Sequence, residues 1–129
     1  MLRNNSDAFS CFKYANTAMY IQLILSTDER FAKKHKDLKE IVAGDEVYDN
    51  IDFFQNYNNQ PFAYHPFQLA FFLLNLNSIV DNTSPERDLV DLLWFPTGGG
   101  KTEAYLAVSA FTIFWRRMQN PDNCKGVSV

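Results

Sequence analysis

The chain has 129 residues, about the length of one domain. Apolar types make up 47% of it and charged types 21%, a balance that argues against disorder throughout. The net charge is −3, with 12 Lys and Arg against 15 Asp and Glu, which argues against nucleic-acid binding through a basic surface spread over the whole chain. A local basic patch stays open.

Residues 1–64 predict a mostly helical N-terminal region. Apolar residues recur at three- and four-residue steps over 8–25, and Ser6 or Asp7 is placed to cap that helix. A second helix is expected to follow and to stop at Gly44. The rest of this region mixes asparagines with aromatics, which indicates an irregular connector.

Residues 65–129 predict the start of an α/β nucleotide-binding domain. A third helix is expected over 66–77. The apolar run at 89–95 predicts a strand covered on both faces, and a long apolar helix follows over 103–118. A second strand is expected to begin at 125–129. One full strand and the start of another would make an incomplete parallel sheet.

A glycine-rich loop lies between the expected strand and the long helix, with the sequence Gly98, Gly99, Gly100, Lys101 and Thr102. Glycines let backbone amides curl closely around phosphate oxygens, and the following helix adds its free N-terminal amides and the positive end of its dipole. Lys101 is expected to reach the β- and γ-phosphates as the catalytic residue, and the Thr102 hydroxyl to ligate Mg²⁺. The sequence therefore predicts a site for ATP and Mg²⁺. The alternative is a flexible glycine turn with a solvated lysine.

The loop departs from the general phosphate-loop pattern, which has a glycine where Phe95 stands. Phe95 to Thr102 resembles instead motif I of superfamily 2 helicases and translocases, in which a non-glycine residue precedes Pro-Thr-Gly-x-Gly-Lys-Thr. The resemblance implies a RecA-like P-loop NTPase core. It also implies that Thr97 and Glu103, at the two ends of the loop, belong with the cofactor-binding residues.

An upstream segment, His65 to Gln68, resembles the part of the same family in which an aromatic–glutamine pair recognises adenine. A glutamine amide both donates and accepts, which matches the paired groups on the edge of adenine. The resemblance implies that Phe67 and Gln68 bind the base. The alternative is that Gln68 is a polar residue on the exposed face of an amphipathic helix.

Residues 12–19, 66–71 and 91–97 together resemble the helicase subunit of DISARM-type bacterial antiphage systems. The resemblance implies an ATP-dependent DNA helicase or translocase in phage defence, with DNA and defence-complex subunits as partners. The family's Asp-Glu box and the arginine of its second RecA-like domain do not occur in this sequence. We therefore expect the N-terminal part of a larger motor, unable to hydrolyse ATP by itself and able to self-associate.

Two further interpretations stay open. In the first, the helical residues 1–60 form an assembly or binding module that docks to a partner subunit, and the glycine loop is a vestige. In the second, the chain is a phosphate-loop enzyme unrelated to helicases, which leaves Pro96-Thr97 and the Gln68 segment unexplained.

The sequence also predicts a soluble cytoplasmic location. The longest apolar run, Leu69 to Leu74, is far shorter than the ~20 residues of a membrane span. The first residues lack the charged and apolar regions of a secretory signal. Cys11 and Cys124 are far apart in the sequence, and we expect reduced thiols rather than a disulfide or a zinc site.

Overall fold

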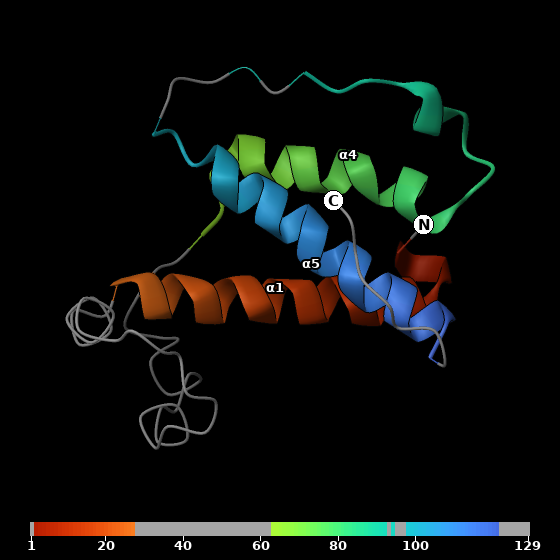
Figure 1. Cartoon of the computed structure of the whole chain (residues 1–129), viewed down its shortest axis with the longest axis horizontal. Coiled ribbons are helices and arrows are strands. Elements are labelled where there is room, and N and C mark those ends of the chain that lie inside the picture. Colours follow the sequence, from red (N-terminus) through yellow and green to blue (C-terminus); the bar gives the residue numbers. More distant parts are fainter. Residues whose placement is uncertain (1, 28–62, 93, 95–97, 122–129) are drawn as a thin grey trace, which may run out of the picture. The chain divides into compact units, whose positions relative to one another are not determined.

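The computed structural model describes residues 2–27, 63–92, 94 and 98–121, without the side chains of 24–27. These ranges contain the helices α1 (Ser6–Thr27), α4 (Pro66–Val80) and α5 (Lys101–Gln119) and the short 3-10 helices η1 (Leu2–Asn4) and η2 (Pro85–Asp88) (Figure 1). The chain divides into two compact units, Met1–Met19 with Tyr64–Val129, and Tyr20–Ala63. All contacts discussed below lie in the first unit. Of the second unit, the structure describes the end of α1 and Ala63.

Helix α1 begins with a side-chain cap and presents small residues to the core. Asn5 Oδ1 accepts a hydrogen bond from the Ala8 N–H at 3.0 Å, so Asn5 is the cap where Ser6 or Asp7 was expected. Asp7 lies in the first turn, where a carboxylate interacts favourably with the helix dipole. The buried residues follow at steps of three and four: Ala8, Cys11, Ala15 and Met19. Three of them, Ala8, Cys11 and Ala15, are small and let neighbouring helices approach closely.

Helix α4 confirms the helix predicted over 66–77 and continues to Val80. Pro66 occupies the first helical position, where its missing N–H costs nothing. Phe72 lies at the centre of the core, with its ring centroid 5.4 Å from that of Phe12 and 6.1 Å from that of Phe111. The buried residues of α4 are spaced four apart: Gln68, Phe72 and Leu76.

Helix α5 confirms the helix predicted over 103–118 and begins two residues earlier, at Lys101. Its buried residues are Ala104, Ala107 and Phe111. Arg116 and Arg117 lie in its last turn, where positive charge complements the helix dipole. The other faces of α5 are only partly covered, although the apolar sequence predicts burial nearly all round: Tyr105 and Leu106 are exposed.

Helices α4 and α5 start at the same end of this unit and run in the same direction, while α1 runs the opposite way (Figure 1). The contacts agree, because Gln68 near the start of α4 binds Gly100 just before α5. Likewise Cys11 Sγ, near the start of α1, lies 3.8 Å from Met118 Sδ at the end of α5. The core between the helices is made of these buried residues: Ala8, Cys11, Ala15, Met19, Phe72, Leu76, Ala107 and Phe111.

The strand predicted at 89–95 is wrong. Among its described residues, Leu89, Val90, Leu92 and Trp94 have no regular structure and are between 68% and 95% exposed. The described part of the chain contains no strand at all, so the expected α/β class, with a full strand in an incomplete RecA-like core, is overturned by a helical structure. An apolar run becomes a buried strand only where neighbouring strands pair with it and helices cover it. The described residues supply no such neighbour.

Several other predictions lie outside the described residues. They are the second helix ending at Gly44, the connector after it and the strand expected at 125–129. The division into 1–64 and 65–129 stays a prediction.

The connection from α4 to α5 is well fixed where it begins. Asp81 Oδ1 accepts hydrogen bonds from the Thr83 N–H at 2.8 Å and the Thr83 hydroxyl at 2.7 Å, and these bonds lower the pKa of Asp81. Ser84 Oγ caps η2 by accepting from the Glu86 N–H at 3.3 Å. Asn77 in α4 donates to Ser84 Oγ at 3.2 Å and to Glu86 Oε2 at 2.8 Å. The Asn77 side chain of α4 therefore holds the start of η2.

Candidate nucleotide-binding loop

The glycine loop turns directly into α5 through two residues in the left-handed region. Gly98 has φ +83° and Gly100 has φ +82°, a conformation that costs any residue with a Cβ roughly 1–2 kcal/mol. Gly100 is the N-cap of α5, so Lys101 and Thr102 occupy its first two positions. The predicted order of glycine loop, Lys-Thr and helix is therefore present. Thr97 lies outside the described residues.

The side chain of Gln68 connects this loop to α4. Its Oε1 accepts a hydrogen bond from the His65 N–H at 2.7 Å, and its Nε2 donates to the Gly100 carbonyl at 2.8 Å. The side chain is 4% exposed, so it does not lie on a solvent face of α4. Recognition of adenine by Gln68 stays a prediction.

Positive ends of two helix dipoles meet at the loop. The Gln68–Gly100 hydrogen bond holds the first turn of α4 beside the start of α5, and the positive ends of the two helix dipoles favour an anion there. Glu103 lies in the first turn of α5, and its Oε2 is buried without a hydrogen-bond partner among the described residues.

The two residues predicted to contact phosphate and metal differ in exposure. Thr102 is exposed and Lys101 is partly buried. The described residues contain no group of three His, Cys, Asp or Glu side chains that could hold a metal ion. Mg²⁺ commonly keeps several waters and binds through one or two protein groups together with substrate phosphates. A single accessible hydroxyl at Thr102 therefore fits a Mg²⁺ ion that is also bound to nucleotide phosphates.

The first turn of α4 also carries the predicted base-contacting aromatic residue. The rings of His65 and Phe67 are nearly parallel, with centroids 6.0 Å apart and an interplanar angle of 7°. His65 is exposed and Phe67 is partly buried. The structure thus brings Phe67, Gln68 and the loop together at one end of α4 and α5, and a base contact by Phe67 stays a prediction.

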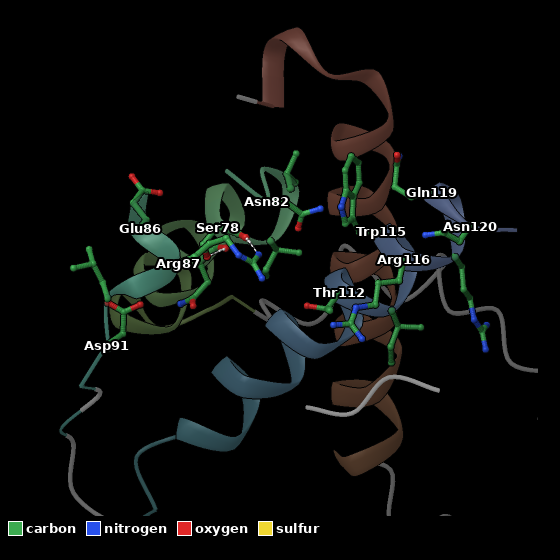
Figure 2. A pocket seen from close by; sticks show the side chains of 16 residues that line it. Ser78, Asn82, Glu86, Arg87, Asp91, Thr112, Trp115, Arg116, Gln119 and Asn120 are labelled. Atoms are coloured by element: carbon green, nitrogen blue, oxygen red, sulfur yellow. Dashed lines mark hydrogen bonds between the residues drawn. The ribbon is translucent and has the colours of Figure 1, made fainter. Parts of the chain in front are cut away.

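A separate open hollow lies toward the other end of these helices, between α4, η2 and α5 (Figure 2). It is lined by both acids and bases, among them Glu86, Asp91, Arg116 and Arg117. Arg87 also lines the hollow, and its guanidinium points to the backbone carbonyl of Ser78 and donates to it (Figure 2). No predicted site residue lines this hollow, and no motif in the sequence indicates it.

The helical fold and the glycine loop define a candidate phosphate-binding segment. A comparison with curated proteins adds a relative: the chain is 40% identical over 114 residues to DISARM protein DrmA of Bacillus paralicheniformis. The matched region covers 88% of this chain and 9% of that relative. This similarity supports a DISARM-type defence protein. No protein-family model matches the sequence, and no solved structure matches it.

No helix among the described residues combines the length and the apolar character that crossing a bilayer requires.

Proposed function

We propose that this chain supplies the ATP phosphate-binding loop of a DISARM-type protein that acts in phage defence as an ATP-dependent DNA helicase or translocase. The observation that carries the proposal is the pair of left-handed glycines, Gly98 and Gly100, placed directly before a Lys-Thr pair at the start of α5. Relatedness to a DISARM protein supports the setting in phage defence. The helicase activity follows from the resemblance of the loop to motif I.

Each part of the loop has a role in this proposal. Backbone N–H groups of Gly98 to Thr102 bind the phosphate oxygens, and the start of α5 contributes the positive end of its dipole. Lys101 neutralises charge on the β- and γ-phosphates, and Thr102 provides a hydroxyl ligand for Mg²⁺. Mg²⁺, when bound, would supply positive charge that offsets the charge of the phosphates. The first turn of α4 lies next to the loop and adds a second helix dipole.

Binding of Mg²⁺-ATP is the direct test. Titration calorimetry with the 129-residue chain should detect binding, and Lys101→Ala should weaken it at least tenfold because the cation is lost from the phosphate site. Lys13→Ala is the matched control, since Lys13 is an exposed lysine of α1 whose ammonium lies over the Phe9 ring. Equal affinity in Lys101→Ala and the wild-type chain would contradict the proposal.

Hydrolysis requires groups that this sequence does not contain. These 129 residues contain no Asp-Glu box after the loop, and the family that the loop resembles takes its transition-state arginine from a second RecA-like domain. We therefore expect binding without turnover in the isolated chain. A phosphate-release assay with DNA present should give the same rate for the wild-type chain and Lys101→Ala. A clearly higher rate in the wild-type chain would show that the chain is itself a hydrolase.

A second candidate function is assembly with a partner subunit. The observation that favours it is the exposed apolar side chains between η2 and the glycine loop, on Leu89, Val90, Leu92 and Trp94. Large exposed apolar groups in succession are typical of an interaction surface. The nucleotide titration separates the two functions, because an assembly module with a vestigial loop binds no ATP.

A further inference from the structure

The amide of Gln68 joins the N-caps of two helices. His65 is the N-cap of α4, and the helical backbone offers its N–H no acceptor. The Gln68 side chain supplies one, Oε1, at 2.7 Å. Gly100 is the N-cap of α5, and its carbonyl accepts from Gln68 Nε2 at 2.8 Å. The two bonds fix which end of the amide is oxygen, because an N–H group needs an acceptor and a carbonyl needs a donor.

Close packing at Gly100 shows how tightly the amide sits against the loop. A Cβ on Gly100 would lie 2.5 Å from Gln68 Nε2 and 3.6 Å from Gln68 Cδ. Any other residue at this position would therefore displace the amide as well as strain the backbone. Gly98 has nearly the same positive φ, yet a Cβ there would meet nothing within 4 Å. The contact with Gln68 is thus specific to the glycine that begins the helix.

We propose that Gln68 is a positioning residue that holds Gly100 and the start of α5 in the phosphate-binding conformation, and that it contributes no selectivity for adenine. The proposal deepens the proposed function and rests on it where nucleotide binding is concerned. Reading adenine requires an amide oxygen and an NH₂ group that both face the base. In this chain the oxygen is bonded to His65, the nitrogen is bonded to Gly100, and the side chain is 4% exposed.

Two substitutions separate the roles of this amide. Gln68→Glu keeps an acceptor for the His65 N–H but places a carboxylate oxygen against the Gly100 carbonyl, which breaks the bond to the loop. Gln68→Met keeps the length of the side chain without a buried charge, and it decides the matter if Gln68→Glu fails to fold. Gln119→Glu is the control, because it makes the same change at an exposed position at the far end of α5.

The first measurement needs no ligand. Amide hydrogen exchange followed by mass spectrometry should show faster exchange over residues 98–103 in Gln68→Glu and Gln68→Met, by roughly tenfold for the loss of one hydrogen bond. Exchange over 104–119 should match that of Gln119→Glu. Unchanged exchange over 98–103, or an equal rise along the whole of α5, overturns the positioning role.

The second measurement compares ATP, GTP and inorganic tripolyphosphate, each with Mg²⁺. Both Gln68 variants should lose affinity for all three ligands by a similar factor, roughly three- to tenfold. A loss confined to ATP overturns the proposal, because it makes Gln68 an adenine-reading residue. If the wild-type chain binds none of the three while exchange over 98–103 still rises in the variants, the proposed function fails and the positioning of the loop by Gln68 stands.

Discussion

Gly98 and Gly100 share a left-handed backbone conformation but have different surroundings. Gly98 is exposed and has no atom within 4 Å of the position of a Cβ, whereas Gly100 faces the Gln68 amide and the Glu103 carboxylate. The Gln68 amide is anchored at both ends, so it is unable to move away without breaking a hydrogen bond. Two alanine substitutions with the same backbone cost therefore differ in their packing cost.

Substitution of these glycines by alanine measures that difference. We expect Gly98→Ala to lower the free energy of unfolding by about 1–2 kcal/mol, the cost of a left-handed alanine. Gly100→Ala should cost about 1 kcal/mol more, because it also breaks the bond between Gln68 and the Gly100 carbonyl. Urea unfolding of both variants gives the comparison. Equal losses would mean that the Gln68 contact contributes no stability.

At the scale of elements, sequence periodicity was sufficient for α1, α4 and α5 and insufficient for the strand expected at 89–95. The buried face of α4 repeats every four residues, a pattern that one helix displays by itself. The run at 89–95 has no such internal signal. Its apolar residues favour burial, but strand formation also depends on pairing with a neighbouring strand. The described residues do not contain one. The described residues of the run are therefore exposed where the sequence predicts a core strand.

Phe72 tests how α4 stabilises the core. Its ring is fully buried and contacts aromatic rings before α4, on α1 and on α5, those of Tyr64, Phe12 and Phe111. Phe72→Ala should lower the free energy of unfolding by about 3–5 kcal/mol, through lost burial and the cavity left behind. Leu74→Ala, on the same helix but 68% exposed, should change it by less than about 0.5 kcal/mol. Unfolding in denaturant, monitored by circular dichroism, measures both losses. Similar losses in the two variants would contradict this packing.

At the scale of the whole molecule, a buried phenol makes stability depend on alkaline pH. Tyr64 packs against the core, and burial raises its pKa from 10.0 to about 12. The unfolded chain therefore loses the phenol proton at a lower pH than the folded chain does. The protonated Tyr64 phenol therefore contributes fully to the stability of the folded state below pH 10, and this contribution is lost as the pH rises toward 12.

Thermal unfolding between pH 8 and pH 12 checks this dependence. The melting temperature of the wild-type chain should fall more steeply above pH 10 than that of Tyr64→Phe, which has no phenol to ionise. At neutral pH, Tyr64→Phe should be at least as stable as the wild-type chain, because the Tyr64 hydroxyl is buried without a partner among the described residues. Tyr105→Phe is the matched control at an exposed tyrosine. Parallel curves for Tyr64→Phe and the wild-type chain would exclude Tyr64 as the source.

The loop and its place before a helix were predictable from the sequence, because the glycines, the lysine and the threonine are consecutive in the chain. The bond from Gln68 to the Gly100 carbonyl was not, since it depends on two helices starting side by side. Asn5 as the cap of α1 was missed in favour of its neighbours Ser6 and Asp7, all of which are suitable cap residues. Tertiary geometry, rather than residue type, decides the bond between Gln68 and Gly100.

Parallel helices such as α4 and α5 need a connection that returns along their length. In this chain the connection exposes Leu89, Leu92 and Trp94, where a protease such as chymotrypsin is able to cut. A single cut there releases neither helix, because Phe72 still packs on Phe111 and Gln68 still binds Gly100 across the break. The nicked protein should travel as one species on a sizing column and separate into two pieces only in denaturant. Parallel pairing thus makes α4 and α5 a naturally splittable pair.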